Sequence, residues 1–334
     1  MVTSLYRSST YIVEFFQRMK AAIEPITESF EIVFVNDGSP DDSLEVVLEL
    51  ARTDDRIVVV DLSRNFGHHP ALLTGLETSR GELVLTMDVD LEEPPELFGE
   101  FYQAFIEHHV DVVYGYQTRR KGGLSERLTG SLFWKLINLD KYSVRIPENP
   151  LTIHLMSRRY VAAILSHRER VVFLAGIYAL AGFAKWPLAV QKSSKGSSVY
   201  TWRRKVNLFM TAITSFTMWP LMYTFYLGLL IASMAAATGV VIVILKILSL
   251  SVHIQELSLG WPSLLASVWF LGGCNIFSIG LIGIYLSQVF TEVKARPVSI
   301  VREVYRNVGQ SSLEKDIPVP ADESDGTGGI GKPF

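Results

Sequence analysis

The sequence predicts an α/β domain with a mainly parallel β-sheet, followed by a hairpin of two transmembrane helices. Residues 1–200 contain short apolar runs rich in β-branched residues, and these runs alternate with helical stretches. Two long runs without a charged residue follow, at about 221–245 and 263–290. The last residues, 307–334, combine Gly, Ser and Pro with mixed charge and predict a disordered tail.

Four apolar runs predict the strands of the sheet, because strands that are covered on both faces are apolar throughout. They are FEIVFVND (30–37), RIVVVDLS (56–63), GELVLTMDVD (81–90) and VDVVYG (110–115). Helical stretches lie between them, for example at 43–52 and 70–79. In folds that alternate in this way, ligands bind at the carboxyl ends of the strands. Polar clusters follow two of the strands, at 36–39 and 88–90, so we expect the functional site there.

Each uncharged run is long enough to cross the roughly 30 Å hydrocarbon layer of a bilayer as one helix. Buried core helices are the alternative, but two such runs joined by a short polar loop favour a membrane hairpin. Basic residues precede the first run at 203–205 and follow the second at 294, 296, 302 and 306, whereas the loop 249–260 has no Lys or Arg. Because basic flanks mark the cytoplasmic side, we expect both ends of the hairpin in the cytosol.

These patterns divide the chain into five parts. We expect a catalytic domain at 1–200, a juxtamembrane amphipathic segment at 201–219, the transmembrane hairpin at 220–292, a cytosolic segment at 293–306 and the tail at 307–334. The first part carries most of the residues that could perform chemistry.

The overall charge argues against a protein that binds nucleic acid. Of 334 residues, 31 are Lys or Arg and 34 are Asp or Glu, so the net charge of −3 gives no bulk attraction for a polyanion. An apolar share of 49% is too high for a disordered chain. The single cysteine, Cys274, excludes an internal disulfide framework and a multi-cysteine metal site.

The strongest candidates for chemistry are Asp88 and Asp90, which leave a predicted strand. Alternate carboxylates can converge on one hard cation where the chain turns out of the regular pleat, and Glu92 adds a third oxygen ligand at the same spacing. Such an open site suits Mg²⁺ or Mn²⁺ and leaves positions for phosphate oxygens. A solvated turn is the common alternative for a DxD tripeptide, but the apolar strand before it and Pro94-Pro95 after it favour the metal site.

A second acidic turn, VNDGS, ends an earlier strand. Asp37 could accept hydrogen bonds from a nucleobase or a ribose, while Gly38 lets the backbone turn tightly. A simple Asx turn is the structural alternative.

Six segments carry a resemblance to a known family. They are FVNDGSPDDS (34–43), SRNFGHHPALLTGLETSRGE (63–82), MDVDLEEPPE (87–96), VVYG (112–115), LMSRRY (155–160) and GLIGIYLSQVFTEVKARP (280–297). As a set they resemble the membrane-bound polyprenyl-phosphate glycosyltransferases of glycosyltransferase family 2, which include dolichyl-phosphate mannose synthase and bacterial polyisoprenyl-phosphate glucosyl transferases. The resemblance runs from about residue 3 to 306 and implies a GT-A nucleotide-sugar domain attached to a membrane hairpin.

The resemblance assigns roles to single positions. Asp37 matches the acidic residue that binds the base, Asp88 and Asp90 match the metal and diphosphate motif, and Glu92 stands where the family usually has Gln. Arg127 and Ser131 match positions that the family uses near the phosphates, so the implied catalytic residues are Asp88, Asp90, Arg127 and Ser131. Tyr6, Arg64 and Asn65 are expected to contact the donor, with a structural turn as the alternative for the last two. We expect no metal at the adjacent pair His68-His69, because neighbouring side chains rarely chelate one ion.

Three departures from the family pattern bear on activity. Only Met1–Leu5 precede Tyr6, where the family has a longer first strand, and Gln117 stands where an Arg often follows the VYG strand. Thr152 and His154 replace an Asp and an Arg of the family. That Asp is a proposed acceptor-site carboxylate, but a polyprenyl monophosphate is mostly ionised near pH 7, since its second pKa is about 6. We therefore expect its loss to be tolerated.

The acceptor phosphate needs positive charge or hydrogen-bond donors. His154 or Arg158 is expected to help hold it, with an ordinary partly buried histidine as the alternative for His154. Lys192, Lys195 and Arg203 lie in a Gly/Ser-containing run before the first apolar stretch. They form the basic flank of a membrane helix, and we also expect them to close over phosphates.

These observations predict an inverting, metal-dependent transfer of a sugar from a nucleotide diphosphate-sugar to undecaprenyl or dolichyl phosphate, with Mg²⁺ or Mn²⁺ as cofactor. A UDP-sugar is favoured over a GDP-sugar, and the expected location is the bacterial inner membrane. The resemblance also points to a homodimer or homotetramer. Two alternatives stay open. A processive polysaccharide synthase is disfavoured because the Q-x-x-R-W motif is absent, and a catalytically silent, membrane-anchored sugar-nucleotide-binding protein is suggested by the three departures.

Overall fold

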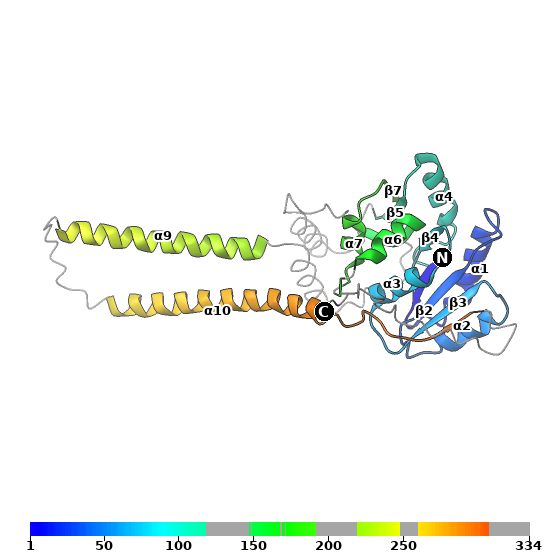
Figure 1. Cartoon of the computed structure of the whole chain (residues 1–334), viewed down its shortest axis with the longest axis horizontal. Helices are drawn as coiled ribbons and strands as arrows, with labels where there is room; N and C mark the ends of the chain where they lie inside the picture. The colour runs from blue at the N-terminus through cyan, green and yellow to red at the C-terminus, as the bar shows by residue number, and fades with distance from the viewer. Residues whose placement is uncertain are drawn as a thin grey trace, which may run out of the picture.

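A computed structural model of the chain describes residues 1–117, 147, 149–167, 169–170, 172–191, 219–247 and 260–306. Over these residues, an α/β domain carries two long helices that extend away from it side by side (Figure 1). The predicted α/β class is confirmed.

Among the described residues, the domain is built on an eight-stranded sheet with the order β7-β5-β6-β4-β1-β2-β3-β8. The strands are β1 (Val2–Leu5), β2 (Ile32–Asn36), β3 (Ile57–Leu62), β4 (Leu83–Thr86), β5 (Val112–Tyr116), β6 (Pro150–Ser157), β7 (Lys185–Ala189) and β8 (Val301–Tyr305). Strand β6 runs antiparallel to β4 and β5, and β8 runs antiparallel to β3, whereas the other pairs are parallel. The sheet is therefore mainly parallel, as predicted, with two antiparallel strands that the sequence pattern did not indicate.

Helices cover both faces of the sheet. The helices α1 (Ile12–Ile23), α2 (Ser43–Ala51) and α4 (Leu97–His108) pack into one core, and α3 (His68–Thr78), α6 (Arg158–Ser166) and α7 (Leu174–Leu180) pack into the other. Every residue of β2 and β3 is buried. Burial on both faces explains why these strands are apolar throughout.

The central strand β1 is short, as the sequence suggested. It pairs with β2 along all four residues but with β4 only at Val2. Helix α3 rests directly on this strand, because a Cβ added to Gly75 would come within 2.3 Å of the Val2 side chain. A glycine at this position therefore lets α3 lie directly against β1, the short strand at the centre of the sheet.

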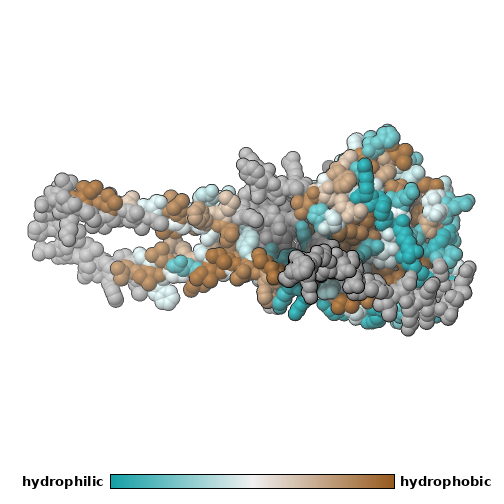
Figure 2. Space-filling view, viewed as in Figure 1, coloured by the Kyte–Doolittle hydropathy of each residue, from teal (hydrophilic) through white to brown (hydrophobic). Residues whose placement is uncertain are grey.

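Two long apolar helices follow the domain, α9 (Trp219–Ile247) and α10 (Gly260–Val293), and they contact each other. Within the described residues, the segment Ser267–Val293 is long and apolar enough to cross a membrane, and Pro220–Ile231 is a shorter apolar stretch. Figure 2 shows apolar side chains along both helices, outside any protein core. The expected hairpin of two membrane spans stays a prediction, and residues 201–218 and 307–334 lie outside the described residues.

The chain after α10 returns to the domain instead of forming a separate segment. Its strand β8 adds to the edge of the sheet beside β3, and the Arg302 guanidinium donates to Asp61 Oδ2 over 2.9 Å. At the end of α10, the backbone N–H of Arg170 donates to both Glu292 carboxylate oxygens, at 2.9 and 3.1 Å. These contacts join the second long helix to the domain at two places.

Candidate active site

Residues predicted from separate motifs meet at one edge of the sheet. Tyr6 follows β1, Asp37 follows β2, Arg64 follows β3 and Asp88 follows β4. Strands β1, β2 and β3 pair in parallel up to their carboxyl ends, so the loops that follow them share an edge. Strand β6 is antiparallel, and its first residues, 150–152, therefore reach the same edge.

The Asp88 carboxylate is held at this edge but stays accessible. The Thr152 hydroxyl donates to Asp88 Oδ2 over 2.9 Å, and His68 Nε2 lies 3.5 Å from Asp88 Oδ1. The other nitrogen of that ring, His68 Nδ1, lies 2.8 Å from the Ser4 hydroxyl. The Asp88 side chain keeps 23% of its surface exposed, so it can still receive a ligand.

The chain turns sharply after Asp88. Leu91 has a φ of 61°, a left-handed conformation that is uncommon for a residue with a side chain. The backbone N–H of Glu92 donates to Asp90 Oδ1 over 2.9 Å, which closes the turn. Val89, Leu91 and Glu93 are buried, whereas the three acidic residues of the predicted motif, Asp88, Asp90 and Glu92, are partly exposed.

The chemistry of this donor set fits a divalent cation that shares its ligands with a substrate. Across the described parts of the chain, no group of three or more His, Cys, Asp and Glu side chains could hold a metal ion by itself. Mg²⁺ commonly binds through one or two carboxylates and completes its coordination with water and substrate phosphates. Asp88 supplies a carboxylate of that kind beside Thr152 and His68, which line a cavity. Asp88, Asp90 and Glu92, all described residues, do not form the predicted cluster of three ligands.

Asp37 has a different environment. The residue is 2% exposed, and its Oδ1 and Oδ2 accept hydrogen bonds from the backbone N–H groups of Phe66 at 2.7 Å and Gly67 at 2.9 Å. Burial raises the pKa of Asp37, and the two backbone N–H groups oppose that rise. Gly38 has a φ of 55°, and a Cβ there would come within 2.5 Å of the Arg64 and Asn65 backbone. Asp37 and Gly38 together hold the loop 64–67 against the end of β2. The Asp37 carboxylate therefore supports this loop; it is not part of an isolated Asx turn, and it is not open to a nucleobase.

The other predicted donor contacts lie at the surface of this edge. Tyr6 is 46% exposed, and Arg64 and Asn65 are exposed as well. The Asn65 side chain donates to the Asp37 carbonyl over 3.2 Å, and the Arg64 guanidinium lies 3.9 Å from the centre of the Phe66 ring. These residues border the site, and their contact with a donor stays a prediction.

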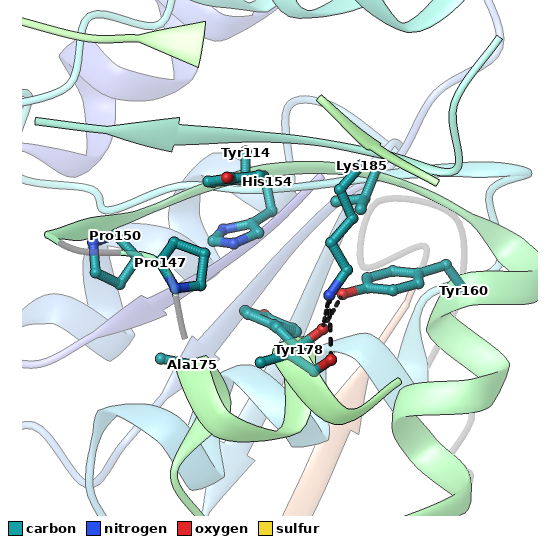
Figure 3. A pocket seen from close by; sticks show the side chains of 10 residues that line it. Tyr114, Pro147, Pro150, His154, Tyr160, Ala175, Tyr178 and Lys185 are labelled. Atoms are coloured by element: carbon teal, nitrogen blue, oxygen red, sulfur yellow. Dashed lines mark hydrogen bonds between the residues drawn. The ribbon is translucent and has the colours of Figure 1, made fainter. Parts of the chain in front are cut away.

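A cavity of about 330 Å³ opens beside Thr152 and His68. One wall is apolar and includes Leu72, Phe173 and Leu174, and Gln117 also lines the space. A smaller cavity of about 20 Å³ shares several of its residues (Figure 3). The larger volume lies within the range of about 300–1,000 Å³ that is typical of small-molecule sites.

His154 lies deep in the wall that both cavities share. The residue is 5% exposed, and burial lowers the pKa of its imidazole from 6.5 to about 4. Nδ1 lies 3.2 Å from the Thr152 carbonyl oxygen, which can only accept a hydrogen bond. Nδ1 therefore carries the ring proton and donates a hydrogen bond to that carbonyl. A neutral ring with its one N–H already donated offers a phosphate neither charge nor a free donor. The structure therefore argues against the expected phosphate contact of His154.

Arg158 does not lie at this edge. It begins α6 after the end of β6, where its side chain donates to the Gly81 carbonyl and, over 3.3 Å, to the Ser79 hydroxyl. Because β6 is antiparallel to β4, this end of β6 pairs with the start of β4, whereas Asp88 follows the end of β4. Its expected contact with the acceptor phosphate is not supported.

The sequence patterns missed several residues of the site. His68 contacts Asp88 although no metal role was expected for it, and its position directly after Gly67 gave no signal of this contact. His69 Nδ1 lies 3.3 Å from the Val172 carbonyl, and burial lowers its pKa to about 4. Tyr178 lines both cavities, yet it belongs to no motif. Five predicted residues lie outside the described residues, namely Arg127, Ser131, Lys192, Lys195 and Arg203.

Comparisons with known proteins give the family and the extent of the match. The model of glycosyl transferase family 2 matches residues 1–165. A Mycobacterium tuberculosis protein that bears a glycosyltransferase name is 41% identical over 305 residues, which cover 91% of this chain and 87% of that protein. The SfII prophage-derived bactoprenol glucosyl transferase of Shigella flexneri is 32% identical over 310 residues, 92% of this chain and 98% of that protein. Among solved structures, S. aureus TarS 1–349 in complex with UDP-GlcNAc is 19% identical, with a TM-score of 0.42 and 64% of each chain covered.

Proposed function

This chain belongs to glycosyltransferase family 2 and is a glycosyltransferase, and from that premise we propose that it moves a sugar from a nucleotide sugar to a polyprenyl phosphate at a membrane surface. The observation that carries the acceptor is the match with a bactoprenol glucosyl transferase, which extends over 92% of this chain and so includes the two long helices. The transfer releases a nucleoside diphosphate.

The membrane part of the proposal rests on exposed apolar surface. Side chains along α10 such as Trp269, Ile276 and Phe277 are largely exposed in the isolated chain. Continuous apolar surface of this length is unfavourable in water and favourable in lipid. We place α10, and α9 beside it, in the bacterial inner membrane, with the catalytic domain and the C-terminus in the cytosol.

The contacts at the end of α10 support delivery of a lipid headgroup to the cavity. Glu292 of α10 accepts hydrogen bonds from the backbone N–H of Arg170, and residues 173–175, a few positions further on, line the cavity. The cavity therefore lies close to the place where the proposed membrane helix meets the domain. A polyprenyl phosphate whose chain remains in the bilayer could present its phosphate there.

We assign the donor diphosphate to the edge that carries Asp88. Asp88 and Asp90 would hold Mg²⁺ or Mn²⁺ together with oxygens of the diphosphate, and such an ion would neutralise charge on the departing nucleoside diphosphate. Thr152 orients Asp88 through its hydroxyl, and Asp37 shapes the loop 64–67 that carries the donor candidates Arg64 and Asn65. The acceptor phosphate is already ionised, so Thr152 in place of an acid is compatible with attack on the anomeric carbon. We favour a UDP-sugar as donor.

A transfer assay tests this function. The full chain, in vesicles that contain undecaprenyl phosphate, is incubated with radiolabelled UDP-glucose, UDP-galactose or UDP-GlcNAc and with Mn²⁺. We expect a labelled lipid product and stoichiometric UDP from one of them. Donor binding without lipid product from any nucleotide sugar would instead support a catalytically silent binding protein.

A further inference from the structure

The shared wall of the two cavities contains two neighbouring rings, of which one carries a hydrogen-bond acceptor and the other a donor. His154 hangs from β6 toward Tyr178 of α7, and their ring centroids are 4.5 Å apart (Figure 3). Because His154 Nδ1 donates to the Thr152 carbonyl, Nε2 carries a lone pair and can only accept. The Tyr178 hydroxyl is buried, and among the described residues it makes no hydrogen bond of normal geometry, although the Thr86 hydroxyl lies close enough to oppose the rise of its pKa. Burial raises the pKa of Tyr178, so its hydroxyl keeps its proton.

Hydrogen bonds to backbone carbonyl groups hold the segments that carry both rings. The Tyr160 hydroxyl donates to the Tyr178 carbonyl over 2.8 Å, and Lys185 Nζ donates to the same carbonyl and, over 3.3 Å, to the Ala179 carbonyl (Figure 3). Lys185 thus binds the last turn of α7 and holds Tyr178 in place. The Thr86 hydroxyl, which lies close to Tyr178, donates to the Thr152 carbonyl over 2.8 Å. These contacts fix the backbone that carries Tyr178 and the Thr152 carbonyl to which His154 donates.

The chemistry of the pair selects a particular kind of ligand. A phosphate oxygen is an acceptor only and would face the lone pair of His154, whereas a hydroxyl group can both accept and donate. An unpaired buried hydroxyl such as that of Tyr178 costs free energy until a ligand supplies its partner. Thr152 connects this wall to the diphosphate edge, since its hydroxyl donates to Asp88 and its carbonyl accepts from His154.

From this arrangement we propose that His154 and Tyr178 recognise one hydroxyl group of the donor sugar and thereby determine which sugar the enzyme transfers. His154 Nε2 accepts a hydrogen bond from the sugar hydroxyl, and the Tyr178 hydroxyl donates a hydrogen bond to the oxygen of that same group. This inference rests on the proposed function, because it assigns the sugar of the nucleotide sugar to the larger cavity. It also replaces the expected contact of His154 with the acceptor phosphate.

The test compares the best nucleotide sugar with its monodeoxy analogues, using the full chain in vesicles with undecaprenyl phosphate. A site that is built to bind a hydroxyl rejects an analogue without it strongly, so we expect one analogue to lose at least about 100-fold in kcat/KM. His154→Phe and Tyr178→Phe should each lose about 10- to 100-fold on the intact sugar but little on that analogue. In these variants, the ratio of kcat/KM between the intact sugar and that deoxy analogue should then approach one. His154→Gln, which can keep an acceptor, should restore part of the discrimination.

Two controls separate recognition from folding. Tyr102→Phe alters a partly buried tyrosine in the core on the other face of the sheet and should keep full discrimination. Thermal unfolding and UDP affinity report whether each variant is folded, and a merely structural role would change these values while leaving the ratio between sugars intact.

The inference is overturned if the His154 and Tyr178 variants discriminate as the wild type does, or if they raise only the KM for undecaprenyl phosphate. A wild type that transfers sugar but accepts every deoxy analogue equally would overturn it and leave the proposed function standing. A wild type that binds neither UDP nor any UDP-sugar would overturn the proposed function, and this inference with it.

Discussion

The loops after β2 and β4 begin alike and serve the site differently. Each places an aspartate beyond a parallel strand, at the same edge of the sheet. Asp37 is 2% exposed and directs both oxygens to the backbone N–H groups of Phe66 and Gly67. Asp88 keeps 23% of its side chain exposed and lies beside Thr152 and His68, which line the cavity. An aspartate that follows a strand can therefore have either of two roles. Where backbone N–H groups bind both of its oxygens, as at Asp37, it supports a loop. Where they do not, as at Asp88, its carboxylate remains available to a ligand.

The largest effect should come from Asp88→Asn. The amide keeps an acceptor for the Thr152 hydroxyl but removes the negative charge that a cation would need. Loss of one electrostatic element of this kind typically lowers kcat by about 10²–10³-fold. We expect such a loss of sugar transfer with an almost unchanged melting temperature.

Glu100→Gln, at an exposed position of α4, is the matched control and should keep full activity. If Asp88→Asn unfolded the protein at a much lower temperature, Asp88 would be a structural residue like Asp37, and the contrast between the two loops would be lost.

Asp37→Ala should act mainly on stability. It leaves the buried N–H groups of Phe66 and Gly67 without their acceptors, and we expect the free energy of unfolding to fall by about 2–4 kcal/mol. Urea unfolding of the full chain measures this change. Asp42→Ala, which alters an exposed carboxylate in the same loop, should change stability by less than about 0.5 kcal/mol. If both variants were as stable as the wild type and only Asp37→Ala lost affinity for UDP, Asp37 would have the base-binding role that the family resemblance implies.

His154 differs from both aspartates, because it is a titratable side chain that is buried in its neutral form. Its pKa is about 4 in the folded protein against an ordinary value of 6.5, so the unfolded state binds more protons between these two pH values. Stability contributed by His154 is therefore complete above about pH 6.5 and is lost as the pH falls toward 4. Between pH 7.5 and pH 5 this group alone should cost about 2 kcal/mol.

Unfolding at both pH values in the wild type and in His154→Phe isolates this contribution. The pH-dependent loss should be smaller in the variant by about that amount. An identical loss in both proteins would mean that the pKa of His154 is not lowered by folding, and the ring could then take up a proton near its ordinary pKa and suit a phosphate.

The smallest effect is expected from Thr152→Val, which removes one hydrogen bond to Asp88 without changing the shape of the side chain much. A residue that only orients a ligand-binding carboxylate should affect metal-dependent activity moderately, and we expect about a tenfold loss of kcat/KM. Thr152→Ser keeps the hydroxyl and should recover most of it. Equal losses in Val and Ser variants would show that the hydroxyl does not act through Asp88.

Local pattern was enough to predict the parallel part of the fold. The buried strands β2 and β3 are apolar throughout because helices cover both faces, and the expected helices at 43–52 and 70–79 correspond to α2 and α3. Strand β8 could not be predicted from such a pattern. It pairs with β3 across more than 230 residues, and its charged residues resemble the basic flank of a membrane helix.

The candidate site shows the same limit. Asp88 and its edge followed from the strand and turn pattern, but Arg158 was misplaced because the reversed direction of β6 puts its two ends at opposite edges. The neutral state of His154 depends on its burial, where it packs against Tyr178, and on the positive charge of Lys185, and both of these residues come from distant parts of the chain. The hydrogen bonds of Asp37 likewise depend on a loop almost thirty residues away.

The central claim is that the open carboxylate at Asp88 supports sugar transfer to a polyprenyl phosphate with the help of a divalent cation. The most direct measurement is formation of sugar-linked undecaprenyl phosphate by the wild type and by Asp88→Asn in the same vesicles, each with Mn²⁺ and after its removal by chelation. We predict product only for the wild type with Mn²⁺, and recovery of activity when the ion is restored. Equal product from Asp88→Asn, or an undiminished rate in metal-free buffer, would contradict the account.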